Sequence, residues 1–295
     1  MRSARIHEHG DASVIRIDDV PQPVPGSGQV LVKVAATSFN PTELALRSGV
    51  LWSLFPIPLP YTLGWDVAGT VAGSPVIGWL EGGAAAEYVA APSDRLVSAP
   101  TSIPLTDAAA IPLAGLTAWQ TVFPHVSAGQ RVLINGAGGG IGGFAVQLAK
   151  HAGAHVVATA GPRSLDAVRR YGADQIIDYT KNSVASGVDP VDVMIHLVGT
   201  PPPWVPPVRR EGVIISAAAP VTAPPGVTSS QLVARYDTAQ LAELVKLVDA
   251  GVVTVDVTES YPLDAIAEVH RRSEAGEIRG KVTIIPGRQA THSPA

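Results

Sequence analysis

A glycine-rich turn joins an apolar run to an amphipathic run near the middle of the chain, and this feature says most about the fold. Residues 131–150 read RVLINGAGGGIGGFAVQLAK, the pattern of a buried strand, a tight turn and a helix. Gly138, Gly140 and Gly143 fit the spacing G-x-G-x-x-G, in which glycines let the backbone approach a pyrophosphate at a helix N-terminus. The strand before the turn and the helix after it favour a dinucleotide-binding turn over an ordinary glycine-rich connection.

The composition excludes several classes of protein. The chain has 295 residues, enough for two domains, and its apolar fraction of 46% provides for a sizeable core. A formal net charge of −4 and the lack of a basic run argue against nucleic acid and anionic membranes as partners. Cysteine is absent, which excludes disulfides and cysteine-ligated zinc and fits a cytoplasmic protein. The first nine residues contain no apolar signal core.

The pattern of expected secondary structure differs between two parts of the chain. The first hundred residues carry short apolar runs broken by proline and glycine, which predict a β-rich, barrel-like region with strands at 14–17, 30–34, 66–71 and 86–90. From about residue 116, expected strands at 131–135, 155–159, 175–178, 192–198 and 212–216 alternate with helical or loop segments. This alternation predicts a parallel, doubly wound sheet. Further expected elements are helices at 164–171, 238–250 and 263–275, a last strand at 281–285, and a frayed end at 286–295.

The chain has one long uncharged segment and one segment rich in proline. Residues 108–130 have no charged side chain, but prolines and polar residues interrupt them, so we expect buried helix and loop instead of a membrane span. Residues 201–207 (PPPWVPP) cannot form a helix interior and follow the strand that ends near Val198. Loops at the carboxyl ends of parallel strands line ligand crevices, so this segment shapes a pocket or serves as a rigid surface connector.

The second strand of a dinucleotide fold indicates which nicotinamide cofactor is bound. An acidic residue at its end favours NAD, whereas a cation suits the 2′-phosphate of NADP. Here the expected strand HVVAT, ending at Thr159, is followed by Ala160-Gly161-Pro162-Arg163-Ser164, with no acidic residue. Arg163 offers a planar charged donor, and Ser164 offers a hydroxyl close to a helix N-terminus. These residues predict NADPH.

At this point the chain resembles the zinc-independent medium-chain dehydrogenase/reductase superfamily, and within it the quinone oxidoreductase, or zeta-crystallin-like, branch. The resemblance runs nearly end to end, and its segments together are far more specific than any one of them. They are residues 29–34 (QVLVKV), 39–43 (FNPTE), 63–71 (LGWDVAGTV), 84–89 (AAAEYV), 107–112 (DAAAIP), 116–118 (LTA), 136–142 (GAGGGIG), 171–174 (YGAD) and 279–282 (RGKV).

The resemblance implies an α/β fold with a GroES-like β-barrel domain and a Rossmann doubly wound parallel-sheet domain. The implied parts are 1–115 for the GroES-like substrate domain, 116–255 for the NADPH-binding domain, and 256–295 for a segment that returns to the first domain. It also implies a homodimer, and Asn40 and Thr117 near the nicotinamide. The full set of residues expected at the cofactor is Asn40, Thr117, Ala137, Gly138, Gly140, Ile141, Gly142, Thr159, Ala160, Arg163, Ser164, Tyr179, Val198 and Ser216.

No metal site is expected. Zinc-dependent alcohol dehydrogenases share the implied fold, but this chain has Gly64-Trp65-Asp66 where they carry G-H-E, and it has no cysteine. Without a Lewis acid, the substrate must itself be activated, which favours quinones, conjugated enones or enoyl thioesters over simple alcohols.

The chain departs from the family at three places. Between residues 73 and 76 the family usually has about a dozen more residues, so we expect a trimmed pocket mouth. Trp52 follows Arg47-Ser48-Gly49 where several relatives place a tyrosine, and residues 52–61 predict an apolar wall that ends at Tyr61. His196 replaces the family's second acid in its strand. Trp52 and Tyr61 are therefore candidates for substrate positioning or packing, and His196 is a candidate for a core residue or a catalyst.

Three functional hypotheses follow. The first is an NADPH-dependent, zinc-free oxidoreductase that transfers hydride to a quinone or an activated C=C bond of a small hydrophobic or aromatic substrate. The second is an enoyl reductase of a biosynthetic, polyketide-type pathway. The third is an NADPH-binding protein with little catalysis, acting as a sensor or structural protein, which the missing tyrosine and His196 motivate.

Overall fold

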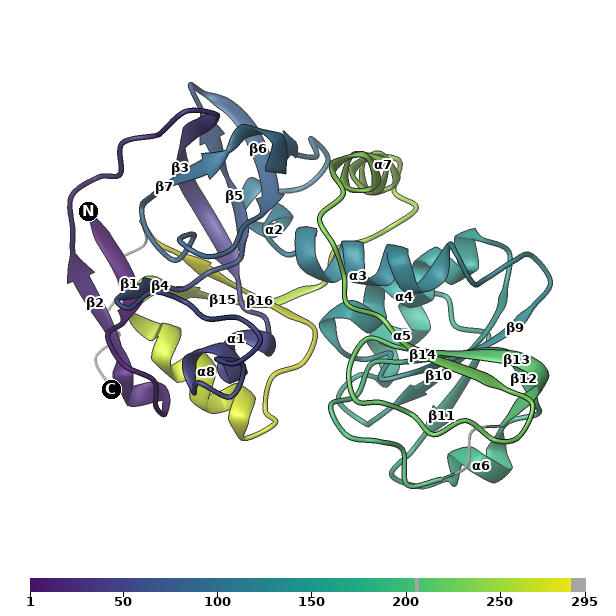
Figure 1. The fold of residues 1–295 in the computed structure, drawn as a ribbon. Coiled ribbons are helices and arrows are strands. Elements are labelled where there is room, and N and C mark those ends of the chain that lie inside the picture. Colours follow the sequence, from purple (N-terminus) through teal and green to yellow (C-terminus); the bar gives the residue numbers. More distant parts are fainter. Residues whose placement is uncertain (205–206, 288–295) are drawn as a thin grey trace, which may run out of the picture. The chain divides into compact units, whose positions relative to one another are not determined.

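The computed structural model describes residues 1–204 and 207–287 (Figure 1). The chain divides into two compact units, each assembled from separate stretches of sequence. The first holds Met1–Leu113, Tyr236–Val245 and the chain from Val257, and the second holds Ala114–Arg235 and Lys246–Asp256. Helices α3 (Pro112–Val122) and α7 (Thr238–Asp249) each begin in the first unit and end in the second.

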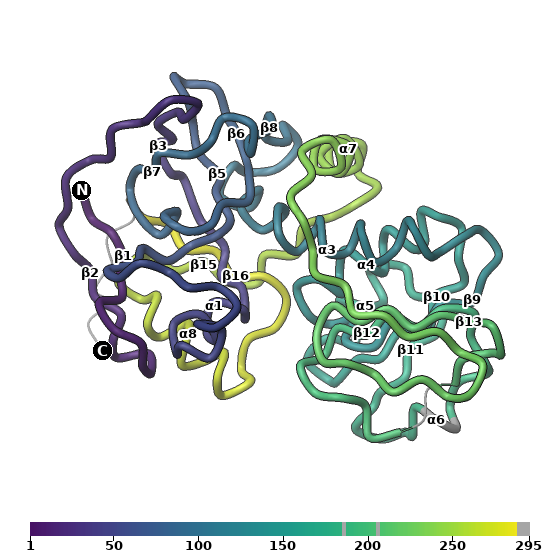
Figure 2. Tube along the Cα trace, viewed as in Figure 1, coloured from purple at the N-terminus to yellow at the C-terminus, as the bar shows by residue number. Residues whose placement is uncertain are grey.

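The first unit is built mainly from antiparallel strands. A three-stranded sheet has the order β2-β1-β4, with bounds Ile15–Asp19, Arg2–Ile6 and Tyr61–Thr62. A seven-stranded sheet runs β15-β16-β3-β5-β6-β8, and β7 pairs with β3 beside this path. Its bounds in that order are Val257–Pro262, Lys281–Ile285, Gln29–Ser38, Asp66–Val71, Ser74–Trp79 and Leu96–Ser98, with Tyr88–Pro92 for β7. Thr283 of β16 lies opposite Ser38 of β3, so the end of the chain completes the sheet begun near its start (Figure 2).

Short helices cover the strands of the first unit. They are α1 (Thr42–Arg47), α2 (Leu105–Ala108), α8 (Ile266–Glu274) and the 3₁₀ turns η1 (Ala12–Val14), η2 (Ser93–Arg95) and η3 (Leu263–Ala265). Phe39, Leu46, Leu63, Val269 and Ile284 belong to one buried cluster, although they come from distant parts of the sequence. The return of the C-terminal segment therefore builds the core of this unit as well as its sheet.

The second unit is a six-stranded parallel sheet of order β11-β10-β9-β12-β13-β14. The bounds in that order are Gln175–Asp178, His155–Ala160, Arg131–Asn135, Val191–His196, Val208–Ser216 and Thr228–Gln231. Its helices include α4 (Gly140–His151), α5 (Leu165–Arg170) and α6 (Val184–Gly187). When its strands are numbered from β9, the order is 3-2-1-4-5-6, the arrangement of dinucleotide-binding folds. The expected fold class is confirmed.

Several expected elements are shifted. The strand expected at 14–17 begins at Ile15, because the carboxylate of Asp11 accepts the Ser13 N–H at 2.8 Å and caps the 3₁₀ turn η1. The strand expected at 86–90 begins at Tyr88. The helix expected at 263–275 starts with the 3₁₀ turn η3 and becomes α-helical at Ile266. Strands β1, β4, β6, β8, β14 and β15 were not expected, since they are short, polar or interrupted by proline.

The connection that is shorter here than in the family is a two-residue turn between β5 and β6. Ala72 and Gly73 have φ of 47° and 88°, the left-handed pair that suits a tight hairpin. The hairpin holds Asp66 opposite Trp79 in the ladder. The short connection is therefore compatible with an unbroken sheet at this edge.

The compact units differ from the expected division of the chain chiefly at residues 236–245, and the other boundaries differ by one or two residues. Residues 236–245 group with the first unit, whereas the family pattern assigned them to the cofactor domain. Tyr236 packs on Trp79 with ring centroids 4.3 Å apart, and the guanidinium of Arg95 lies 3.4 Å from its centroid. Most of the expected frayed end, from residue 288 on, and part of the proline-rich segment lie outside the described residues. Within the described ranges, no helix has the length and apolar character required to cross a bilayer.

Candidate functional site

The glycine turn after β9 has the geometry of a nucleotide cradle. Gly136 has a φ of 95°, so the backbone reverses there in a conformation that suits glycine. A Cβ on Gly142 would lie 2.3 Å from the Gly136 carbonyl oxygen and 2.6 Å from the backbone of Ala137, so helix α4 begins against the turn. The tight turn is therefore made at Gly136, and the close contact between helix and turn is made at Gly142. The motif spacing had indicated Gly138, Gly140 and Gly143 in the same stretch.

The turn also meets the segment that follows the second strand. A Cβ on Gly138 would lie 2.3 Å from the Ser164 hydroxyl oxygen, and one on Gly161 would lie 2.8 Å from that of Tyr179. Ser164 is buried and donates to the Gly161 carbonyl at 3.1 Å, whereas Arg163 and Tyr179 are exposed. The structure thus brings together the residues expected around the adenosine 2′-phosphate.

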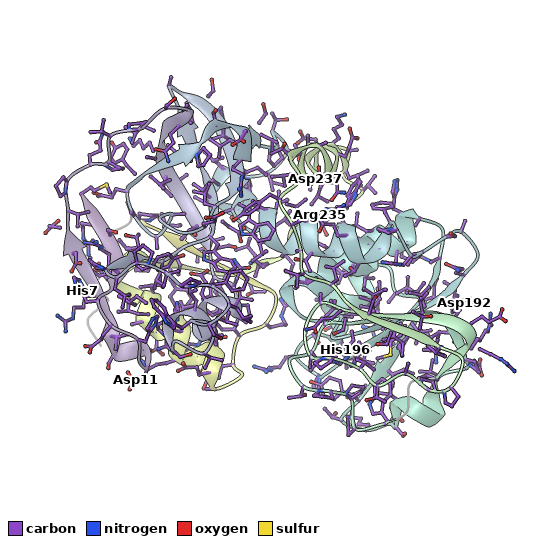
Figure 3. The ribbon with its side chains drawn as sticks, in the orientation of Figure 1. His7, Asp11, Asp192, His196, Arg235 and Asp237 are labelled. Carbon is purple, nitrogen blue, oxygen red and sulfur yellow. The ribbon has the colours of Figure 1, made fainter. Side chains whose placement is uncertain are left out.

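A hydrogen-bonded relay across three strand ends holds the turn (Figure 3 labels His196). The Gly136 N–H donates to Thr159 Oγ1 at 3.0 Å, and that hydroxyl donates to Asn135 Oδ1 at 2.7 Å. Asn135 Nδ2 lies 2.9 Å from His196 Nδ1, and His196 Nε2 lies 3.0 Å from the Thr200 carbonyl oxygen. The imidazole therefore accepts at Nδ1 and donates from Nε2.

His196 is fully buried, and burial lowers its pKa, which keeps the ring neutral. Both ring nitrogens are already engaged, so the geometry gives this histidine a structural role in orienting Asn135.

The other expected cofactor residues of the second unit lie on the same turn, at strand ends or on helices α3 and α4. Val198 faces the turn, since a Cβ on Gly136 would lie 3.1 Å from one of its methyl groups. The Ser216 hydroxyl donates to the Ala219 carbonyl and accepts the Ala218 N–H at 3.2 Å. Ala137, Thr159 and Ala160 are buried, and Gly140 and Ile141 open helix α4. Thr117 is buried on α3, in the second unit.

A buried polar network surrounds Asn40 in the first unit. The Asn40 side chain is 4% exposed, and its Nδ2 donates to Asp66 Oδ2 at 2.8 Å and to the Ser38 carbonyl at 3.3 Å. Its Oδ1 accepts from Lys281 Nζ at 2.7 Å. Asp66 Oδ2 also accepts from the Ser38 hydroxyl, and Asp66 Oδ1 accepts the Leu113 N–H at 2.8 Å. Both amide donors of Asn40 are thus held by the protein.

Glu43 lies beside this network on α1. Its carboxylate accepts the Asn40 N–H at 3.3 Å and the Gly64 N–H at 3.0 Å. Burial raises the pKa of Glu43 to about 7, and the nearby Asp66 carboxylate adds to the shift. Burial also lowers the pKa of Lys281. Two ionisable groups next to Asn40 are therefore displaced from their usual ranges toward neutrality.

Trp52 and Tyr61 occupy different environments. Trp52 is 47% exposed, and its ring meets His9 edge-on at 5.2 Å. Leu54 and Phe55 are also exposed, so this part of the expected apolar wall faces outward from its unit. Tyr61 is buried, donates to the Glu81 carbonyl at 2.7 Å and accepts from Trp65 Nε1 at 2.9 Å. Its hydroxyl is committed to the fold, and burial raises its pKa.

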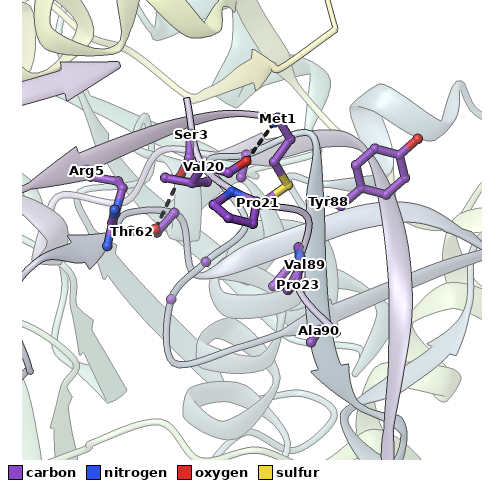
Figure 4. Close-up of a pocket in the computed structure, with 13 residues that line it drawn as sticks. Met1, Ser3, Arg5, Val20, Pro21, Pro23, Thr62, Tyr88, Val89 and Ala90 are labelled. Carbon is purple, nitrogen blue, oxygen red and sulfur yellow. Dashed lines mark hydrogen bonds between the residues drawn. The ribbon is translucent and has the colours of Figure 1, made fainter. Parts of the chain in front are cut away.

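A pocket of about 480 Å³ opens elsewhere on the first unit (Figure 4). It lies around the hydrogen bonds from the Met1 ammonium to the Val20 carbonyl and between the hydroxyls of Ser3 and Thr62. None of the residues expected from the sequence at the cofactor or substrate lines it. In the described parts of the chain, no group of three or more histidine, aspartate or glutamate side chains is arranged to hold a metal ion.

Comparison with known proteins places this geometry in a family. Residues 26–82 match the alcohol dehydrogenase GroES-like domain, and residues 171–284 match a zinc-binding dehydrogenase domain. The chain belongs to the medium-chain dehydrogenase/reductase superfamily, in its quinone oxidoreductase branch. The family resemblance drawn from the sequence is confirmed.

Individual relatives cover nearly the whole chain. It is 31% identical over 305 residues to the NADPH-dependent alkenal/one oxidoreductase, chloroplastic, of Arabidopsis thaliana, covering 95% of this chain and 78% of that protein. It is 29% identical over 319 residues to quinone-oxidoreductase QR1, chloroplastic, of Triphysaria versicolor, covering 94% and 95%. The Escherichia coli quinone oxidoreductase complexed with NADPH superposes with a TM-score of 0.85 at 25% identity, covering 97% and 100%.

Sequence reasoning missed Asp66, Lys281 and Glu43 as members of the network around Asn40. All three lie in segments that were matched to the family, but only as parts of motifs. The available signal was the placement of charged residues in apolar surroundings: Lys281 opens the strand KVTII, of which the first four residues are buried. A charge that is buried in such a strand requires a partner.

Proposed function

We propose that this protein is an NADPH-dependent oxidoreductase that transfers hydride to a quinone or to the activated C=C bond of a conjugated carbonyl compound. The observation that carries the proposal is the cradle formed by Gly136, Gly142 and the start of α4, in a chain whose relatives include NADPH-dependent reductases of this kind. When bound, NADPH supplies the hydride.

The chain's own residues are suited to hold this cofactor. The free N–H groups and positive end of the 12-residue helix α4 favour the pyrophosphate. Arg163 and Tyr179 are both exposed, and the Tyr179 hydroxyl lies near Gly161, two residues before Arg163. This supports a role for both at the 2′-phosphate, which is the feature that separates NADPH from NADH. A Cβ on Gly142 would clash with the backbone of the turn, and one on Gly138 would clash with Ser164, so glycine at these positions lets the turn pack closely against α4 and the segment after β10.

The proposed substrate is small, hydrophobic and conjugated. The exposed apolar side chains of Val50, Trp52, Leu54, Phe55 and Leu59 support this choice. Asn40 and Thr117, whose side chains are buried, are proposed to position the nicotinamide and the acceptor. An activated acceptor also fits the absence of cysteine and of the G-H-E segment, since its own conjugation stabilises the charge left by hydride addition.

The protein is proposed to act as a homodimer. Strand β14 closes one end of the parallel sheet in the second unit, and all four of its residues are exposed. An open strand edge is a surface on which a second copy adds strands. Size-exclusion chromatography with light scattering tests this, and a monomer at micromolar concentration would contradict it.

The experiment for the proposed function is an assay of NADPH oxidation with matched acceptors. The panel pairs a small quinone, a 2-alkenal, a conjugated ketone and an enoyl thioester with the saturated aldehyde and ketone of the same length. We expect turnover of conjugated acceptors or quinones only. Turnover of enoyl thioesters alone would favour a biosynthetic enoyl reductase. NADPH binding without turnover of any acceptor would support a sensor or structural protein, and no binding would overturn the proposal.

A further inference from the structure

Lys281 is a buried cation in the middle of the first unit. It is 4% exposed, and its Nζ donates to the Phe39 carbonyl at 3.0 Å and to Asn40 Oδ1 at 2.7 Å. Its Nζ also lies 3.7 Å from Asp66 Oδ2, and Asp66 is completely buried. All three ammonium protons therefore have an acceptor nearby, as a buried lysine requires.

Asn40 bridges the two charges. Its carbonyl oxygen accepts from the Lys281 ammonium, and its amide nitrogen donates to the Asp66 carboxylate. A flipped carboxamide would direct an N–H at the ammonium and an oxygen at the carboxylate. The pair of opposite charges therefore permits only one orientation of this side chain.

Asp66 connects the same network to helix α3. Its Oδ1 accepts the N–H of Leu113, the second residue of α3, at 2.8 Å. A carboxylate at this position satisfies a backbone N–H that the helix leaves unpaired and complements the positive end of the helix. Thr117 lies on α3 four residues after Leu113, one turn along.

We propose that Lys281 is a positioning residue of the reductase site, fixing the carboxamide of Asn40 and, through Asp66, the start of the helix that carries Thr117. The inference rests on the proposed function, in which Asn40 and Thr117 position the nicotinamide and the acceptor. It gives the segment Arg279-Gly280-Lys281-Val282 a role in the site. Lys281 contacts Asn40 and is proposed to affect the reacting groups only through Asn40 and Asp66.

Other ionisable groups also face this network. Glu43 interacts electrostatically with both Asp66 and Lys281, and the phenol of Tyr236 also feels the charge of Asp66. In the wild type the Lys281 ammonium offsets the Asp66 charge. A variant that lacks the ammonium has a carboxylate buried beside Glu43 without that cation, so a new proton uptake in this cluster is expected.

The test compares Lys281→Met with the charge-neutral double variant Lys281→Met/Asp66→Asn. The single variant leaves a buried carboxylate without its cation and carries a risk of misfolding, whereas the double variant removes both charges. The matched control is Lys33→Met, which changes an exposed lysine on β3. The measurements are thermal unfolding, NADPH affinity by fluorescence, and kcat and KM across pH with the best acceptor of the panel.

We expect the double variant to fold and to bind NADPH within about threefold of wild type, because the phosphate cradle lies in the other unit. Its kcat should fall about tenfold or more, since Asn40 is no longer held in one orientation. Where Lys281→Met folds, its profile of kcat/KM should gain an acidic limb absent from the wild type and from Lys33→Met. Adding Thr117→Val to the double variant should lower kcat by less than it does in the wild type, because both changes disturb one positioned set.

The outcomes separate the two proposals. A folded double variant with wild-type kcat and pH profile, in an active protein, overturns the inference alone. Fully multiplicative effects of Thr117→Val and the double variant also overturn it, since they deny the link through α3. A wild-type protein that neither binds NADPH nor reduces any acceptor overturns the proposed function first, and the inference with it.

Discussion

The side-chain amide of Asn135 donates to Nδ1 of His196 at 2.9 Å, and the two residues stand at the ends of adjacent strands β9 and β12. Through the Thr159 hydroxyl, Asn135 also reaches the N–H of Gly136, where the backbone reverses. The buried His196 thus stabilises the glycine turn through Asn135 and Thr159. Both of its ring nitrogens are used within the protein, so neither is free for a substrate.

Replacing His196 by phenylalanine should destabilise the second unit and loosen the turn. The change leaves the Asn135 amide and the Thr200 carbonyl without their partner, which costs about 1–3 kcal/mol for a buried polar group. NADPH affinity should fall several-fold, with a smaller change in kcat at saturating cofactor. Chemical denaturation and cofactor titration measure both. A loss of kcat by about a thousandfold with unchanged stability and affinity would instead make His196 a catalyst.

Gly142→Ala should damage both folding and cofactor binding. The added Cβ would lie 2.3 Å from the Gly136 carbonyl oxygen, and backbone atoms there cannot move aside cheaply. We expect a loss of about 2 kcal/mol or more in unfolding free energy and weak NADPH binding. Gly139→Ala is the matched control, since its Cβ meets only the Gly136 oxygen at 3.5 Å and its φ is −84°. Equal effects of the two substitutions would contradict the packing described here.

The fold was predictable because each half of the chain has a consistent local pattern. Alternating strands and helices after residue 116 require a parallel sheet, and a glycine turn after its first strand indicates a nucleotide site. The individual roles of the glycines were not predictable from spacing. Whether a position needs glycine depends on its φ and on which backbone atom faces its Cα. The positive φ occurs at Gly136, and the close backbone contact occurs at Gly142.

The network around Asn40 was hidden for a different reason. Lys281 contacts a residue 241 positions earlier, and this separation is bridged only when β16 pairs with β3. A single lysine at the start of an apolar strand is equally typical of an exposed strand end. Tyr61 and His196 were chosen as candidates by residue type, and their hydrogen bonds to Glu81 and Asn135 were set by tertiary packing that no local pattern reports.

Arg163→Ala should weaken NADPH binding far more than NADH binding. The lost contact to a 2′-phosphate is charge-assisted and worth about 1.5–3 kcal/mol, whereas NADH lacks that group. Isothermal titration with both cofactors measures the difference. Arg169→Ala is the control, because Arg169 lies on the neighbouring helix and pairs with Asp166 at 2.7 Å. If affinity for both cofactors falls equally in Arg163→Ala, the 2′-phosphate is held elsewhere.

The free energy of unfolding of the wild type should fall as pH rises through 7, and Glu43→Gln should not show this fall. The folded-state pKa of Glu43 is raised to about 7 from an ordinary 4.5, chiefly by burial. The folded protein therefore binds more protons than the unfolded chain between these values, so this contribution is full below pH 4.5 and lost as pH rises through 7. The loss amounts to about 3 kcal/mol, and denaturation at pH 5 and pH 8 should show it in the wild type only. An identical pH dependence in Glu43→Gln would contradict the assignment.

His270→Phe should act in the opposite direction and protect the protein against acid. His270 is fully buried on α8, and its ring meets Phe39 edge-on at 5.0 Å. Burial, with the neighbouring Arg47 charge, lowers its pKa to about 3 from 6.5. The unfolded chain then binds the extra proton between these values, so wild-type stability is full above pH 6.5 and falls as the pH drops toward 3. From pH 6.5 to pH 5 the loss is about 2 kcal/mol, which the phenylalanine variant should not show in denaturation at the two pH values. Substituting His7, which is exposed and pairs with Asp18 at 2.7 Å, serves as the control. Acid sensitivity retained in full by His270→Phe would place the titrating group elsewhere in the fold.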